Sequence, residues 1–153
     1  MTADTLAAQR SAPATLAQLI AGVSDDTLHR RPAPGKWSVV EIIAHLAEDE
    51  LSSSWRYRQM IEHDGAALLG FDQELWERLG DYASWTVRDA LDMFRLLRQA
   101  NVTLLSRLSP AEWERSGTHA ERGRLTVRSL AAHMVGHDAN HFAQIQRILA
   151  GGV

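Results

Sequence analysis

Three segments of the chain begin with almost the same phrase, and each phrase has the chemistry of a helix start. The phrases are Trp37-Ser38-Val39-Val40-Glu41, Trp85-Thr86-Val87-Arg88-Asp89 and Leu125-Thr126-Val127-Arg128-Ser129. In each, Ser or Thr can accept hydrogen bonds from free backbone amides, and the apolar residue before it can pack against the first turn. Ser38 and Glu41 also form a capping box. These starts favour a helical fold.

The spacing of apolar residues after these starts predicts three long helices. They run from Ser38 to about Gly65, from Thr86 to about Leu108, and from Thr126 to about Ala150. Short helical turns are expected from Asp72 to Leu79 and around Trp113. No segment between the helices alternates apolar and polar residues as a strand does, so the predicted fold class is all-α.

A further helix is predicted near the N-terminus, from about Ala12 to Val23, with Ser11 as its cap. Proline suits the first turn of a helix better than the interior, which places Pro13 near the start. Residues 1–10 are then expected to be frayed or to form a short separate helix.

Four main helices predict a four-helix bundle. The longest connection, Ala66 to Ser84, lies between the second and third helices. Parallel neighbours need a crossover as long as the bundle, so this connection predicts an up-down-down-up order. With 153 residues and 45% apolar content, residues 1–153 are expected to form a single domain.

Composition excludes several function classes. The net charge of -3 and the dispersed arginines give no basic stripe, so nucleic acid is not an expected partner. The chain has no cysteine, which excludes disulfides, thiolate metal sites and a protein thiol nucleophile. No apolar run has the length of a membrane span or a signal-peptide core, so a cytoplasmic protein without membrane partners is expected.

Histidines supply the strongest functional signal. His137 and His141 lie one helical turn apart, about 6 Å along the axis, which is a common way to hold one metal ion. His133 extends the same stripe, but it lies about 12 Å from His141, so only one adjacent pair can bind the same ion. His45 lies in an apolar stretch of another helix, where an unsatisfied imidazole would be costly.

Topology decides between the two histidine pairs. His45 lies about 10 Å into its helix, so a parallel last helix would favour His133 and an antiparallel one would favour His141. The predicted up-down-down-up order makes the helices antiparallel and selects His45, His137 and His141. Gly136 costs helix propensity beside His137, which predicts a close neighbour at its backbone. Three histidines are left unassigned and are expected to face solvent or to be hydrogen-bonded: His29, His63 and His119.

Two motifs carry a family resemblance. They are Arg31-Pro32-Ala33-Pro34-Gly35-Lys36-Trp37-Ser38 with Glu41 and His45-Leu46, and His137-Asp138-Ala139-Asn140-His141 with Gln144-Ile145. In order and separation they resemble the DinB-like superfamily, which includes DinB-type proteins and YfiT-like metal hydrolases. The resemblance implies an up-down-down-up bundle, often dimeric, with nickel or zinc held by three histidines. That role transfers to His45, His137 and His141, whereas His133 matches no ligand position.

The resemblance also implies a class of activity. The family's known reactions are chiefly thiol transfer, in which bacillithiol, mycothiol or glutathione is joined to an electrophile or assists an isomerisation. The prediction is therefore a metal-dependent thiol S-transferase that uses a low-molecular-weight thiol and a small-molecule substrate, as a homodimer. One alternative is a metal-dependent hydrolase, with Asp138, Glu48 or Asp49 as proton acceptor or as partner of an imidazole. The other is a bundle that binds a metal or a ligand without catalysis.

Overall fold

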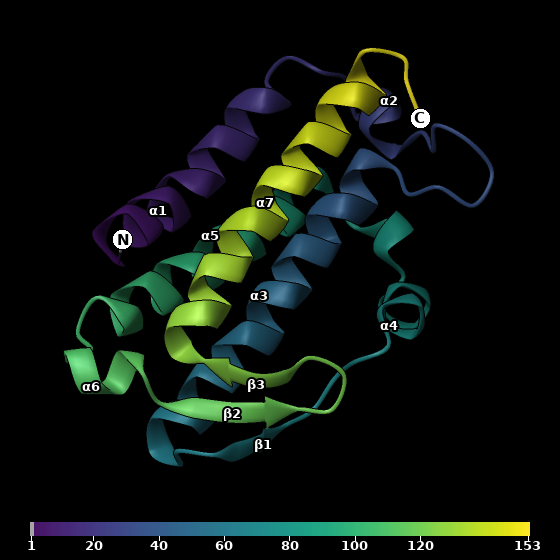
Figure 1. Ribbon diagram of the computed structural model, residues 1–153. Coiled ribbons are helices and arrows are strands. Elements are labelled where there is room, and N and C mark those ends of the chain that lie inside the picture. Colours follow the sequence, from purple (N-terminus) through teal and green to yellow (C-terminus); the bar gives the residue numbers. More distant parts are fainter. Residues whose placement is uncertain (1) are drawn as a thin grey trace.

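Four long helices run side by side in the computed structural model, which describes residues 2–153 (Figure 1). They are α1 (Thr2–Leu19), α3 (Val39–Glu62), α5 (Val87–Leu105) and α7 (Val127–Leu149). In Figure 1, α1 and α7 run in one direction, and α3 and α5 run in the other. The predicted four-helix bundle and its up-down-down-up order are confirmed. Residues 63–86 form the long crossover between α3 and α5.

The predicted helix caps are present in the structure. The Glu41 backbone amide donates to the Ser38 hydroxyl, and the Ser38 amide donates to the Glu41 carboxylate at 2.7 Å. The Thr86 and Thr126 hydroxyls accept in the same way from the third residue of α5 and of α7. The three helix starts therefore lie within one residue of their predicted positions.

Short elements fill the connections between the long helices. They are α2 (Asp25–His29), β1 (Ala66–Leu68), α4 (Gln73–Gly80), the 3-10 helix η1 (Tyr82–Ser84), α6 (Pro110–Trp113), β2 (Ser116–His119) and β3 (Gly123–Thr126). Helices α4 and α6 are the two predicted turns, whereas α2 was not predicted.

The expectation that no segment forms a strand was wrong. A three-stranded sheet in the order β1-β2-β3 lies across one end of the bundle (Figure 1). β1 pairs in parallel with β2, and β2 pairs antiparallel with β3. A Cβ at Gly117 of β2 would lie 2.7 Å from Leu68 Cγ, so only glycine allows this close pairing. Strands of three or four residues are too short to show alternation in the sequence.

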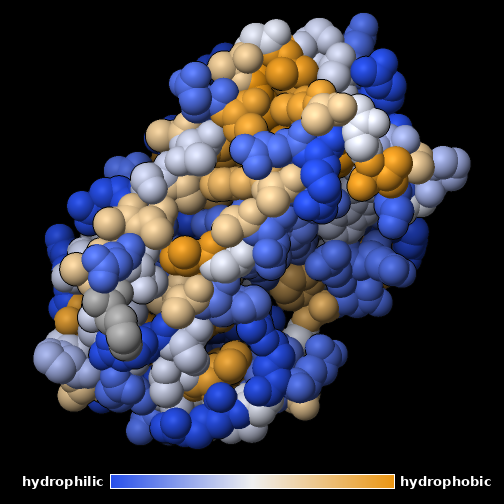
Figure 2. Space-filling model, turned by 45° about the horizontal axis from the view of Figure 1, so that its top comes forward, coloured by the Kyte–Doolittle hydropathy of each residue, from blue (hydrophilic) through white to orange (hydrophobic). Residues whose placement is uncertain are grey.

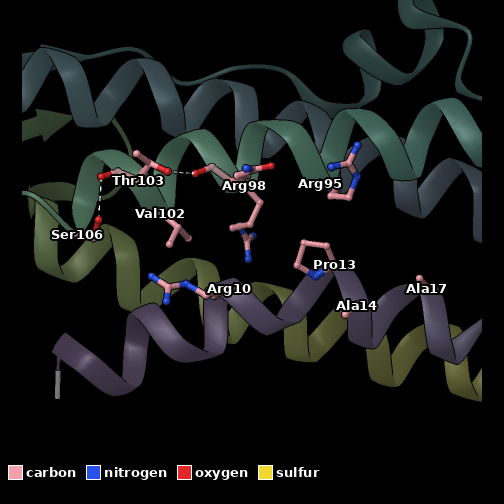
Figure 3. A pocket seen from close by; sticks show the side chains of 10 residues that line it. Arg10, Pro13, Ala14, Ala17, Arg95, Arg98, Val102, Thr103 and Ser106 are labelled. Atoms are coloured by element: carbon pink, nitrogen blue, oxygen red, sulfur yellow. Dashed lines mark hydrogen bonds between the residues drawn. The ribbon is translucent and has the colours of Figure 1, made fainter.

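The N-terminal helix also differs from its prediction. α1 begins at Thr2 instead of Ala12, so residues 2–10 are helical, and Pro13 lies inside the helix. Residue 1 lies outside the described residues. Because proline has no N–H, it leaves the Gln9 carbonyl without its helical donor, and Arg98 Nη1 of α5 donates to that oxygen at 3.3 Å. Figure 3 shows Arg98 pointing towards α1 beside Pro13, in a groove of about 620 Å³.

Two apolar clusters form the core. One joins α1, α3, α5 and α7 around Leu16, Ile43 and Phe94, and the other lies nearer the sheet around Tyr57, Leu105 and Leu130. Apolar side chains also reach the surface at the top of the view in Figure 2. None of the helices within residues 2–153 combines the length and the apolar character needed to span a membrane.

Candidate metal centre

Three histidine side chains from two helices converge inside the bundle. His45 comes from α3, and His137 and His141 come from α7. One ring nitrogen of each lies within 4.8 Å of the other two, and the Nε2 atoms of His45 and His137 are 3.2 Å apart. Nitrogen ligands at about 2.1 Å from a tetrahedral metal are separated by about 3.4 Å. The spacing of the imidazoles therefore fits a shared metal ion.

The hydrogen bonds around the cluster are incomplete. His45 is 1% exposed, and neither its Nδ1 nor the Nδ1 of His137 has a hydrogen-bond partner among residues 2–153. The Nε2 atoms of His45 and His137 face each other, and only one of the two can carry the proton of a hydrogen bond between them. Buried polar atoms without partners are rare, because each costs free energy. The unpaired nitrogens therefore indicate a site for a bound ligand other than a protein side chain.

Burial keeps all three imidazoles neutral. Burial, followed by the neighbouring His141, lowers the pKa of His45 to about 3. Burial also lowers the pKa of His137, and burial together with His137 lowers the pKa of His141. A neutral imidazole has the free electron pair that a metal ion requires. The three side chains are therefore in their ligating form near pH 7.

Polar side chains flank two of the three rings. His141 Nδ1 lies 2.9 Å from Gln144 Oε1, so the ring donates there and its Nε2 is left for the cluster. The carboxylate of Asp49 lies 3.5 Å from His137 Nδ1. Carboxylates and amides beside metal-binding histidines hold the ring in one orientation and one tautomer.

Only one of the three carboxylates considered from the sequence adjoins the imidazoles closely. Asp138 accepts two hydrogen bonds from Arg98 instead, at 2.6 and 3.1 Å. Glu48 accepts from the Tyr82 hydroxyl at 2.7 Å. Successive residues of a helix point about 100° apart. For this reason Asp138 lies on a different side of α7 from His137.

The remaining histidines and Gly136 give mixed outcomes. His29 and His63 are exposed as expected, and His133 lies outside the triad with its ring 6.0 Å from that of His137. His119 fulfils the other half of the expectation: the pairing of β2 with β1 and β3 leaves it 4% exposed, and its Nδ1 accepts a hydrogen bond from the Glu121 backbone N–H. The close neighbour predicted at Gly136 is absent: a Cβ there would meet nothing within 4 Å among the described residues.

A cavity of about 240 Å³ opens beside the imidazoles. Its walls include His45, His137 and Asp49. Further along α3 it is lined by Arg56, and the β2–β3 hairpin adds His119. Neither Arg56 nor a role for His119 was predicted from the sequence. The signal for Arg56 was its place at helical spacing after His45 and Asp49, whereas His119 depends on a sheet that the sequence did not predict.

Comparison with known proteins agrees with this architecture. The family model described as DinB superfamily matches residues 9–145. The chain belongs to the DinB superfamily. Among its curated relatives, a protein of Oceanobacillus iheyensis is 24% identical over 135 residues, covering 88% of this chain and 78% of the relative. YfiT of Bacillus subtilis is 23% identical over 137 residues, covering 89% and 77%. Both carry the name "Putative metal-dependent hydrolase".

Two solved structures share the fold of this DinB-superfamily chain. YfiT from Bacillus subtilis, described as having "an unusual four-helix bundle topology", superposes with a TM-score of 0.91 at 21% identity, over 99% of this chain and 89% of YfiT. The mycothiol-dependent maleylpyruvate isomerase superposes with a TM-score of 0.75 at 10% identity, over 95% of this chain and 60% of the isomerase. At these identities the likeness establishes the fold alone.

Proposed function

We propose that this DinB-superfamily protein is a metal-dependent enzyme that joins a low-molecular-weight thiol to a small electrophile. Its metal ligands are His45, His137 and His141. The observation that carries the proposal is the convergence of three imidazoles from α3 and α7, two of which line a small cavity. Imidazole suits both nickel and zinc, and these are the metals we propose.

Each residue of the centre has a physical task. Three neutral ligands leave the ion its full positive charge, and Gln144 fixes the ring of His141. When bound, the ion would supply Lewis-acid chemistry that lowers the pKa of a thiol or a water delivered to it. Asp49 lines the cavity beside His137 and can accept the proton that such a group releases.

The sulfur nucleophile of a thiol transfer must come from outside the chain. The protein has no cysteine, and none of the side chains lining the described cavity carries a hydroxyl, thiol or amine. A thiol cosubstrate would fill this role. The mycothiol-dependent maleylpyruvate isomerase, which depends on such a thiol, shares the fold and supports this choice.

Hydrolysis is the second candidate. The carboxylate of Asp49 beside His137 could equally take a proton from water, and the curated relatives are named as metal-dependent hydrolases. A bundle that binds a metal or a ligand without catalysis is the third. The homodimer that the family resemblance implies is also part of the proposal and is tested by the mass of the protein in solution.

Metal content tests the centre directly. Elemental analysis of purified wild-type protein is expected to find about one nickel or zinc ion per chain. The His141→Ala variant should lose this metal, because only two imidazoles are then left to bind it. The control is His63→Ala, which removes an exposed histidine and should retain the metal. A metal-free wild type, or a His141→Ala variant with full metal content, would contradict the proposal.

Turnover separates transfer from hydrolysis. Metal-loaded protein is incubated with a generic electrophile and, in separate arms, glutathione, bacillithiol or mycothiol, and loss of the thiol is followed. Thiol consumption above the uncatalysed rate, absent in His141→Ala, supports the transferase. Cleavage of model esters without thiol would support the hydrolase instead. Inactivity in both assays would favour the binding bundle.

A further inference from the structure

Arg56 is a buried cation with unused hydrogen-bond donors. It lies on α3 and is 6% exposed. Its Nη2 donates to the Leu69 carbonyl at 2.9 Å, and no carboxylate of residues 2–153 lies within ion-pair distance. The N–H groups on Nη1 and Nε have no acceptor within the same residues. A guanidinium has five donors, and a buried one is normally paired with an anion.

His119 presents a second donor at the same place. It is 4% exposed, and its Nδ1 accepts a hydrogen bond from the Glu121 backbone N–H at 3.2 Å. Burial, followed by the charge of Arg56, lowers the pKa of this imidazole and keeps it neutral. Its one proton is therefore on Nε2, which lies 3.5 Å from Arg56 Nη2. Both facing atoms are donors, so neither satisfies the other.

The acidic groups of the cavity do not fill this gap. Asp49 is turned towards His137 and accepts from the Ser52 hydroxyl, and Glu121 makes no ion pair with Arg56. Phe71 lies under the guanidinium, with 5.7 Å between its ring centroid and Arg56 Cζ. That contact holds the planar group in place. What is missing between Arg56 and His119 is an acceptor.

We infer that Arg56 and His119 form a subsite for the oxyanion of a small molecule, either a carboxylate or a phosphate. Arginine binds both groups through paired N–H donors, and His119 adds a third. Arg56 lies eleven residues after His45 on α3, about 16 Å along the axis, and both line the same cavity. As a substrate subsite the inference rests on the proposed function. The substrate or cosubstrate of the proposed enzyme is then an elongated molecule, with an anionic group at the end away from the imidazoles.

Anion binding to the full-length protein tests the subsite without measuring turnover. Acetate and inorganic phosphate, in separate arms, are titrated by calorimetry into protein as purified and after treatment with a chelator. The Arg56→Gln variant is expected to bind at least about tenfold more weakly than wild type in both preparations, and His119→Asn more weakly to a smaller degree. Tighter binding of acetate or of phosphate identifies which oxyanion the subsite prefers.

Matched controls use the exposed residues of the same types. Arg58→Gln changes the same charge two positions along α3, where Arg58 bonds to Ser54, and should bind anions as wild type does. His63→Asn matches His119→Asn and should also have no effect. Circular dichroism confirms that each variant is folded.

A measurement on the wild type covers the case in which Arg56→Gln does not fold. In nuclear magnetic resonance spectra the Arg56 Nε–H signal should move as acetate or phosphate is added, whereas the Arg58 signal should not. Wild-type protein that binds neither anion, an unchanged affinity in Arg56→Gln, or a stationary Arg56 signal would overturn the inference. If the metal is absent but anion binding requires Arg56, the proposed function fails and the subsite stands. If the metal is present and anion binding does not depend on Arg56, the subsite fails and the proposed function stands.

Discussion

Two buried polar clusters lie side by side in this bundle, and they differ in how well their groups are paired. In the first, Arg98 bonds to Glu50 and Asp138, and Asn101 donates to the other oxygen of Glu50 at 2.7 Å. In the second, His45, His137 and His141 converge and leave ring nitrogens without partners. The first cluster is complete without any ligand, whereas the second is not.

Helices α3 and α7 contribute consecutive residues to the two clusters, and α5 adds Arg98 and Asn101 to the first. On α3, Asp49 contacts the imidazoles and Glu50 contacts Arg98; on α7, His137 joins the imidazoles and Asp138 joins Arg98. Burial disfavours the charge of Arg98, yet the Glu50 and Asp138 carboxylates hold its pKa above the ordinary value. A paired network can thus fix the register of two helices while the unpaired cluster beside it is left open for a ligand.

Breaking the paired cluster should have the largest effect. Arg98→Met leaves the carboxylates of Glu50 and Asp138 buried without a cation, which is expected to lower the free energy of unfolding by about 3–5 kcal/mol. Urea denaturation measures this change. The control is Arg95→Met on the exposed side of α5, where a change within about 0.5 kcal/mol is expected. A loss as small as that in Arg98→Met would show that the network does not stabilise the fold.

Filling the unpaired cluster should have the next largest effect. Zinc at about 100 times its dissociation constant should raise the free energy of unfolding by about 3 kcal/mol, because the unfolded chain lacks the site. Thermal denaturation of chelator-treated protein, with and without zinc, measures the gain. His141→Ala should show little of it and His63→Ala all of it. Equal stabilisation of both variants would place the metal elsewhere.

Acid should destabilise the metal-free protein through the histidines. The pKa of His45 is lowered to about 3 in the folded chain, against 6.5 in the unfolded chain. Between these values the unfolded chain binds more protons, so stability falls as pH falls. The loss from this group is about 2 kcal/mol between pH 6.5 and pH 5. Urea denaturation across this range should show a shallower pH dependence for His45→Phe than for wild type. Parallel stability curves for the two proteins would contradict the lowered pKa of His45 in the folded chain.

The smallest effect is expected at Gly136. A Cβ at this position meets no atom within 4 Å, and the residue lies in the interior of α7. Gly136→Ala should therefore raise the free energy of unfolding by about 1 kcal/mol through helix propensity. Metal content measured in the same preparation should not change. Loss of metal in this variant would mean that the backbone beside His137 must be free to move.

The helical frame could be predicted because its signals are local. Ser38, Thr86 and Thr126 cap the helices that they mark, and the length of one connection was enough to set the direction of α7 against α3. That direction is also what brings His45 to the level of His137 and His141. Signals that act within one or two turns of a helix are legible in a single sequence.

The features that were not predicted depend on residues far apart in the sequence. Pro13 is tolerated within α1 because Arg98, far along the chain, supplies a donor to the carbonyl that proline leaves free. β2 gains its strand partners from residues 66–68 and 123–126, so the burial of His119 could not be seen from its neighbours. Arg56 was missed because a lone arginine on a mixed helix face looks like any solvated one until the cavity is known.

The hairpin that supplies His119 has an evolutionary consequence. The three imidazoles belong to two long helices that also carry the Arg98 network, whereas Glu121 and Arg122 belong to the short turn that follows His119 between β2 and β3. Substitutions in that turn can reshape the wall of the cavity at little cost to folding, because surface connections tolerate variation. Descendants of one ancestral bundle can in this way diverge in the shape of this cavity while inheriting the same three imidazoles.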